Sequence, residues 1–91
     1  MNLAWRIEFS PGARKDIKKL DPQAASRIVL FLEQRVATSR HPRELGKPLA
    51  GSRLGNLWRY RVGDYRIVAD LQDNTLTVLV VRIGHRREVY R

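Results

Sequence analysis

The strongest constraint on the fold is a pair of alternating segments, LWRYRV and YRIVADL, separated only by Gly63-Asp64. Two such segments joined by a two-residue turn are typical of a β-hairpin. The turn predicts the cross-strand pairs, which are Val62 with Tyr65, Arg61 with Arg66, Tyr60 with Ile67 and Arg59 with Val68. Side chains alternate between the faces of a strand. One face therefore holds Trp58, Tyr60, Val62, Tyr65, Ile67 and Ala69, and the other holds Arg59, Arg61 and Arg66.

The arginine face indicates an anionic partner. Like charges directly opposite each other on a sheet destabilise it by about 0.2–1 kcal/mol, and a bound polyanion would offset the cost of placing Arg61 across from Arg66. The composition agrees, since 18 Lys and Arg against 9 Asp and Glu give a net charge of +9. A charge of this size favours nucleic acid as the partner. The alternative is that these arginines form an ordinary solvated face.

Length and composition also limit the number of domains and the kinds of cofactor, disulfide and membrane segment that we expect. The 91 residues form one domain, residues 1–91. With no cysteine and two histidines, the chain has no disulfide framework, and we expect no metal and no cofactor. No apolar run reaches the roughly 18 residues of a membrane span, and no signal peptide opens the chain. We therefore expect a cytoplasmic protein.

The N-terminal half predicts a strand and two helices. Alternation from Leu3 to Phe9 favours a half-buried strand. Ser10-Pro11 is a helix start, and the first helix buries Ala13, Ile17 and Leu20. Asp21-Pro22 repeats this start signal, and the second helix runs to about Thr38. Its apolar stripe comprises Ala25, Ile28, Val29, Leu32 and Val36.

The C-terminal half completes a small α+β domain. Residues 40–56 are rich in glycine, proline and basic residues, which predicts a long ordered loop with one short turn. After the hairpin, Asp73-Asn74 turns the chain into a last strand, Thr75–Ile83, which ends at Gly84. Alternation places Leu76, Val78 and Val80 on the core face and Thr77, Leu79, Val81 and Ile83 on the arginine side. The expected order is β-α-α-β-β-β, with the helical hairpin on one face of a mainly antiparallel four-stranded sheet.

Three segments resemble the RelE family of bacterial toxins, within the RelE/ParE superfamily: KPLAG, WRYRVGDYRIV and VVRIGHRREVY. The resemblance covers essentially the whole chain. It implies a toxin of a type II toxin-antitoxin system that cleaves messenger RNA in the ribosomal decoding site. It also implies a cognate RelB-like antitoxin and a toxin-antitoxin hetero-oligomer. The alternatives are a ParE-like inhibitor of DNA gyrase without catalysis, and a basic RNA-binding module.

The resemblance implies a catalytic set. Arg66, Arg86 and Tyr90 match functional positions of the family. Arg59 and Arg61 stand where the best-known members carry lysines, one of which has been proposed as the general base. A guanidinium stays protonated at neutral pH and is a poor base. Either arginine stabilises charge here, or another residue accepts the proton.

Metal-free RNA cleavage requires that the 2′-hydroxyl lose its proton, that the charge on the phosphorane be held, and that the 5′-oxygen be protonated. We expect Arg61 and Arg66 to hold the scissile phosphate, and Arg86 to hold the phosphate or the leaving oxygen. His85 carries an imidazole suited to proton exchange, and Tyr90 would stack on a base or orient the ribose. The alternatives without a catalytic role are that His85 is an ordinary surface residue and that Tyr90 holds the C-terminal segment against the sheet. The expected RNA-binding residues are Arg59, Arg53, Lys47, Arg82 and Arg87.

Overall fold

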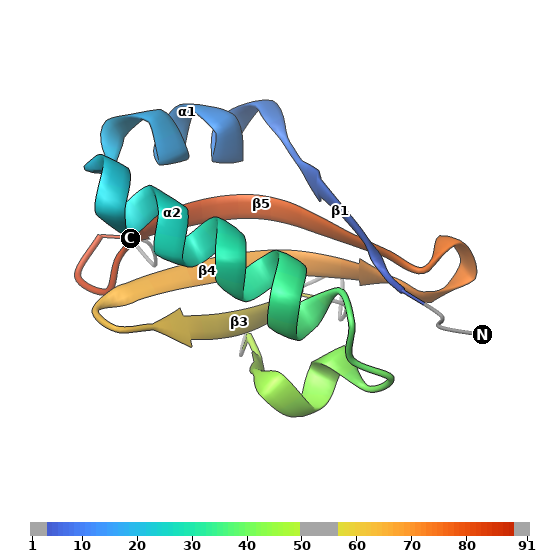
Figure 1. Ribbon diagram of the computed structural model, residues 1–91. Coiled ribbons are helices and arrows are strands. Elements are labelled where there is room, and N and C mark those ends of the chain that lie inside the picture. The colour runs from blue at the N-terminus through green and yellow to red at the C-terminus, as the bar shows by residue number, and fades with distance from the viewer. Residues whose placement is uncertain (1–3, 50–56, 89–91) are drawn as a thin grey trace.

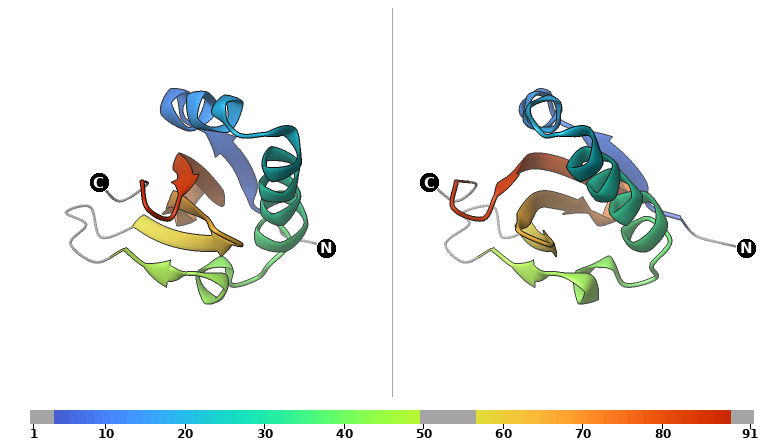
Figure 2. Two further views of the ribbon diagram at one scale, coloured as in Figure 1. Left: turned by 90° about the vertical axis from the view of Figure 1, so that its left-hand side faces the viewer. Right: turned by 60° about the vertical axis from the view of Figure 1, so that its left-hand side comes forward.

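The computed structural model describes residues 4–49 and 57–88. Two helices lie on one side of a five-stranded sheet whose strand order is β1-β5-β4-β3-β2 (Figure 1). The strands are β1 (Arg6–Phe9), β2 (Lys47–Pro48), β3 (Leu57–Val62), β4 (Tyr65–Gln72) and β5 (Thr77–His85). β1 is parallel to β5, and the other neighbours are antiparallel. Figure 2 shows the helices on one side of the curved sheet and the segment carrying β2 beyond β3.

The predicted α+β class is confirmed, but the sheet has five strands and not four. The additional strand is the two-residue β2, which pairs with β3 inside the segment that we predicted to be a loop. The predicted short turn in this segment is a 3-10 helix, η2 (Pro42–Leu45). A strand of two residues has no alternation of its own, so its pairing depends on tertiary contacts.

Both helices begin where the sequence predicts. Helix α1 (Pro11–Lys19) is capped by Ser10, whose Oγ accepts a hydrogen bond from the Ala13 amide at 3.1 Å. Helix α2 (Pro22–Phe31) is capped by Asp21, whose Oδ1 accepts from the Ala24 amide at 2.9 Å. Each has proline in its first turn, where an amide hydrogen is not needed. α2 continues as a π-helical turn, η1 (Leu32–Val36), so the predicted extent of the second helix is close to that observed.

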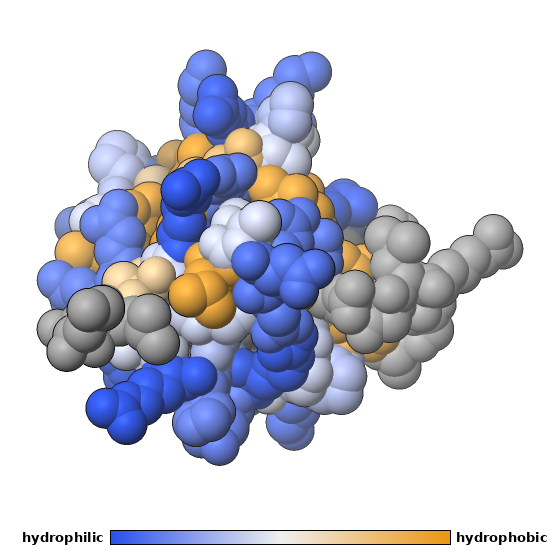
Figure 3. Space-filling view, turned by 90° about the vertical axis from the view of Figure 1, so that its right-hand side faces the viewer, coloured by the Kyte–Doolittle hydropathy of each residue, from blue (hydrophilic) through white to orange (hydrophobic). Residues whose placement is uncertain are grey.

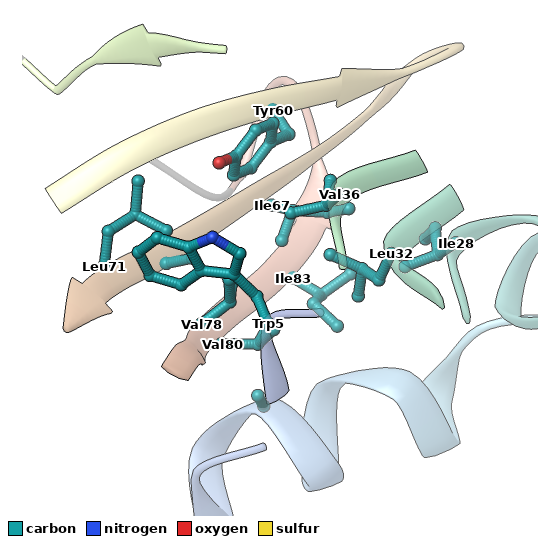
Figure 4. Close-up of a cluster of buried hydrophobic side chains, with 12 residues drawn as sticks. Trp5, Ile28, Leu32, Val36, Tyr60, Ile67, Leu71, Val78, Val80 and Ile83 are labelled. Carbon is teal, nitrogen blue, oxygen red and sulfur yellow. The ribbon is translucent and has the colours of Figure 1, made fainter. Parts of the chain in front are cut away.

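The core lies between the helices and the sheet (Figure 4). Ile28, Leu32 and Val36 are fully buried, whereas Ala25 and Val29 of the predicted stripe are half-buried. Their partners include Trp5, which directly precedes β1, and from the strands Tyr60, Ile67, Leu71, Val78 and Val80. Burial of one aliphatic side chain contributes about 1.5–3 kcal/mol. The burial of these side chains holds one face of the sheet against the helices. The other face of the sheet is therefore turned away from the helices.

The hairpin register is confirmed at all four predicted pairs. Gly63, the first central residue of the turn, has φ +59°, as a type II′ turn requires, and glycine adopts this conformation without a steric penalty. Arg61 and Arg66 are therefore side by side on the face away from the helices. β5 extends through His85, two residues beyond the predicted end at Ile83.

A β-bulge in β5 contradicts the predicted position of Ile83. Val80 pairs with Ala69 and Arg82 pairs with Val68, so Val81 is an extra residue on β5. The extra residue reverses the alternation. Ile83 consequently faces the core, where it is 2% exposed, instead of the arginine side. Arg82, which pairs with Val68, lies on the arginine side instead of Ile83.

Helix α1 supplies the hydrogen bonds that support this bulge. The β1–β5 pairing ends at Phe9 and Val80. Beyond it, Ser10 Oγ donates to the Val81 carbonyl at 3.2 Å. Asp16 Oδ2 accepts from the Ile83 amide at 2.9 Å. Side chains of the helix thus replace a neighbouring strand along this edge of β5.

Candidate nucleic-acid interface

A row of residues on the face away from the helices crosses four strands. Lys47 of β2 is opposite Arg59 of β3, Arg59 is opposite Val68 of β4, and Val68 is opposite Arg82 of β5. Paired residues share a face, so the three cationic side chains all lie on one face, and all are exposed. We call Lys47, Arg59, Arg61, Arg66 and Arg82 the basic face.

Arg61 and Arg66 form the next row, beside the hairpin turn. The guanidinium of Arg66 is anchored, because Nη1 donates to the carbonyls of Gly63 and Tyr65, both at 3.0 Å. A guanidinium has five N–H donors, so several remain for a ligand. No carboxylate pairs with either arginine within the ranges 4–49 and 57–88. The pair therefore offers two positive charges that are not paired with a carboxylate, and the Arg66 guanidinium is held in place.

The pair opens onto a cleft of about 380 Å³. The cleft is lined by Glu44, Leu45, Gly46, Lys47, Arg59, Tyr60, Arg61 and Arg66. Four of these side chains are cationic and one is a carboxylate. Because forked guanidinium donors match phosphate oxygens, the cleft is suited to a phosphodiester.

The wall of the cleft formed by η2 is fastened to β3. The Tyr60 hydroxyl donates to the Pro42 carbonyl at 2.8 Å in a buried hydrogen bond. Burial raises the pKa of Tyr60 to about 12, so the phenol remains a donor. Gly46 touches the strand so closely that an added Cβ would lie 2.5 Å from the Arg59 carbonyl oxygen. Only glycine fits at this approach.

Arg43 fastens the same wall to the opposite end of the sheet. Its Nη1 and Nη2 donate to Asp73 Oδ1 at 2.9 Å and Oδ2 at 2.6 Å. Its guanidinium also lies 5.7 Å from the centroid of the Trp58 ring. The hydrogen bond with Arg43 lowers the pKa of Asp73, and the same bond raises the pKa of Arg43.

The structure does not bring His85 onto the basic face. His85 pairs with Tyr65, and their ring centroids are 6.1 Å apart. Alternation places this pair on the helix side of the sheet, since the neighbouring pair, Arg66 with Gly84, lies on the other side. His85 Nδ1 accepts from the Arg87 amide at 3.3 Å. The imidazole therefore points away from the cleft.

The segment after β5 lies against the hairpin turn. The Arg86 amide donates to the Asp64 carbonyl at 2.8 Å, and the side chains of Arg86 and Arg87 are exposed. This contact brings the Arg86 backbone to the end of the sheet where Arg61 and Arg66 lie. Arg53 and Tyr90 fall outside the described residues.

Large hydrophobic side chains are mostly covered in the described part of the chain. On the face shown in Figure 3, hydrophobic areas lie between hydrophilic side chains. Leu30 is the one large hydrophobic side chain that is exposed among the described residues, at 46%. No helix within the described ranges is long and apolar enough to cross a membrane. Residues 4–49 and 57–88 also contain no group of three or more potential metal ligands.

Comparison with known proteins identifies the family. The model of the ParE toxin of the type II toxin-antitoxin system, parDE, matches residues 7–90. Toxin RelG of Mycobacterium tuberculosis is 33% identical over 89 residues, covering 98% of this chain and 99% of that protein. Toxin RelE of the same organism is 30% identical over 87 residues, covering 96% and 87%. The chain belongs to the RelE/ParE family of type II toxins.

Solved structures agree with this assignment. The chain is similar to a chain of the toxin-antitoxin complex RelBE2 from Mycobacterium tuberculosis, with a TM-score of 0.82 and 28% identity. The match covers 97% of this chain and 98% of that chain. The intact E. coli RelBE toxin-antitoxin complex gives a TM-score of 0.72 at 23% identity, covering 90% and 96%. At that identity the likeness shows the fold alone.

In this RelE-family toxin, sequence reasoning missed one residue that lines the cleft and one that lies against the hairpin turn. Glu44 lines the cleft. Arg27 of α2 lies against the hairpin turn, because a Cβ on Gly63 would be 3.2 Å from Arg27 Nη2. Neither residue belongs to a motif, and both reach the site through tertiary packing.

Proposed function

We propose that this toxin is a ribosome-dependent endoribonuclease, which cleaves messenger RNA in the decoding site and so inhibits translation. The observation that carries the proposal is the Arg61–Arg66 pair at the basic cleft. Opposed arginines without a carboxylate partner destabilise the sheet. A bound phosphodiester would attract both guanidinium groups and so offset the repulsion between them.

Arg61 and Arg66 would act on the phosphorane. Both present N–H donors to the cleft, and the anchoring of Arg66 means that little reorganisation is needed when charge develops. Removal of one such donor costs about 2.7–4 kcal/mol in other enzymes. Arg86, next to the hairpin turn, would hold the phosphate or the leaving 5′-oxygen. Tyr90 is assigned to base stacking or ribose orientation from the family resemblance alone.

The remaining basic residues would bind the RNA backbone. Lys47, Arg59 and Arg82 form a row that continues from the cleft across the sheet. Arg53 and Arg87 are proposed as further phosphate contacts. We assign His85 no step in the cleft, because it faces the helix side of the sheet.

We also propose a RelB-like antitoxin as partner in a hetero-oligomer, and a cytoplasmic location with the ribosome. Several solved structures similar to this chain are RelBE toxin-antitoxin or RelE-RelB complexes. Co-expression with an antitoxin encoded beside this gene should yield a co-purifying complex that has lost ribonuclease activity.

The direct test is to map 5′ ends of messenger RNA in a translating extract with and without the toxin. We expect new ends at ribosome-occupied codons. Arg66→Ala should remove most of them, whereas Arg35→Ala, at an exposed position on η1, should cleave like the unsubstituted toxin. Circular dichroism should be used to check that each variant is folded. Equal cleavage by Arg66→Ala and the unsubstituted toxin would contradict the assignment.

A second candidate function is inhibition of DNA gyrase, since the family model that matches is described as the ParE toxin. Supercoiling of relaxed plasmid by purified gyrase distinguishes the two. Loss of supercoiling at toxin concentrations that leave messenger RNA intact would favour a ParE-like inhibitor. RNA binding with neither effect would indicate a basic RNA-binding module.

A further inference from the structure

RNA cleavage in the basic cleft needs a group that accepts the proton of the 2′-hydroxyl. The arginines that line the cleft, Arg59, Arg61 and Arg66, are unsuited to this role, because a guanidinium has no acceptor atom. From the composition and geometry of the cleft, we infer that Glu44 is this proton acceptor. The inference rests on the proposed ribonuclease function and names a catalytic residue for it.

The other side chains that line the cleft are unsuited to the role. The Tyr60 hydroxyl is buried and already donates to the Pro42 carbonyl. Leu45 and Gly46 carry no titratable group. Lys47, as an ammonium, has three donors and no acceptor. Glu44 supplies the one carboxylate among the described residues that line the cleft.

The Glu44 carboxylate is also available. The ion pairs of the described residues are Arg6 with Glu8 and Arg43 with Asp73, and neither includes Glu44. Glu44 is exposed to solvent at the cleft. It therefore stands among four cations without being bound to one of them, and it can accept a hydrogen bond from a ribose hydroxyl that enters the cleft.

The backbone that carries Glu44 is held on both sides. Immediately before it, Arg43 makes two hydrogen bonds to Asp73, and Pro42 is buried and accepts from Tyr60. Two residues after it, Gly46 contacts β3 so closely that no side chain fits. The backbone of an acceptor between such anchors is positioned before substrate binds, which lowers part of the entropic cost of reaching the reactive geometry.

The proposed step is a transesterification. Glu44 takes the proton of the 2′-hydroxyl as the 2′-oxygen forms a bond to phosphorus, and the Arg61–Arg66 pair holds the non-bridging oxygens. The bond between phosphorus and the 5′-oxygen then breaks, and the 5′-oxygen takes a proton from solvent water. The products are a 2′,3′-cyclic phosphate and a 5′-hydroxyl, with no net oxidation or reduction.

The test compares Glu44→Gln with the unsubstituted toxin on programmed ribosomes under single-turnover conditions. Correctly placed proton transfer contributes about 10²–10⁴-fold, so we expect cleavage by Glu44→Gln to slow by at least about 100-fold. Ribosome binding should be unchanged or tighter, because the substitution removes a negative charge from a basic cleft. Glu44→Asp should recover part of the rate. Glu33→Gln, an exposed glutamate on η1, is the matched control and should cleave normally.

A message with sulfur in place of the scissile 5′-oxygen tests the direction of proton transfer. A thiolate leaves without being protonated, so loss of a general base persists on this message while loss of a general acid is rescued. We expect the Glu44→Gln defect to persist. Cleavage by Glu44→Gln within threefold of the unsubstituted toxin, or rescue by sulfur, would overturn the assignment alone. Absence of cleavage by the unsubstituted toxin would reject the proposed function and the assignment with it.

Discussion

Asp16→Ala tests whether helix α1 supports the bulge that places Arg82 on the basic face. The substitution removes the acceptor of the Ile83 amide, a 2.9 Å hydrogen bond to a half-buried carboxylate. Hydrogen bonds to charged groups contribute about 1.5–3 kcal/mol. Alanine has a higher helix propensity than aspartate, which would offset about 0.5–0.7 kcal/mol of this loss. The expected net loss is about 0.8–2.5 kcal/mol in the free energy of unfolding.

Urea unfolding, followed by tryptophan fluorescence, measures this loss. With a slope of about 1–3 kcal/mol per molar urea, the midpoint should fall by roughly 0.3–2.5 M without a change of slope. Asp16→Asn keeps an oxygen at the acceptor position but loses the charge, so its stability should lie between those of Asp16→Ala and the unsubstituted toxin. Lys15→Ala, exposed on the same helix, is the control for propensity alone.

Amide hydrogen exchange gives a second measure at the bond itself. Protection of the Ile83 amide should fall in Asp16→Ala, because that donor is left without an acceptor at the edge of β5. If Asp16→Ala were at least as stable as the unsubstituted toxin, helix propensity would outweigh the hydrogen bond. Unchanged Ile83 protection would then show that the bulge does not depend on α1.

Two further predictions concern the wall of the cleft. Burial raises the pKa of Tyr60 to about 12, above an ordinary value of about 10, so its neutral phenol contributes stability that is fully present below about pH 10 and lost as pH rises toward 12. Tyr60→Phe should be less stable by about 0.5–1.5 kcal/mol at neutral pH and should lose less stability over that alkaline range; parallel pH profiles of the two proteins would contradict this. Asp73→Asn should cost at most about 1 kcal/mol, since the Asp73 side chain is 60% exposed. The lowered pKa of Asp73 means that its contribution is present above about pH 4 and lost as pH falls through the folded-state pKa, so an Asp73→Asn effect that persisted in strong acid would refute the ion-pair explanation.

Local patterns were sufficient to predict the hairpin but not the end of β5. The hairpin register depends on a two-residue turn and on alternation, and both are visible in the sequence. In β5, residues on both sides of the strand are apolar, so the alternation of Val80, Val81 and Ile83 carries no signal of a bulge. The deciding contacts come from Ser10 and Asp16, which are about 70 residues earlier in the chain. A one-residue insertion of this kind is set by tertiary structure, and it exchanges the faces of every residue after it.

The same distinction separates the two parts of the candidate site. Arg61 and Arg66 could be predicted because they are a cross-strand pair of one hairpin. Glu44 could not, because a glutamate in a loop rich in charge has no pattern that separates it from solvated neighbours. Its position follows from the anchoring of η2 by Tyr60 and Arg43. In the first contact, the hydroxyl of Tyr60 on β3 donates to the loop carbonyl of Pro42. In the second, Arg43 of the loop binds Asp73 in the turn after β4. The loop that looks irregular in the sequence is thus held in place by the sheet. Glu44 therefore comes to line the cleft only when the chain is folded.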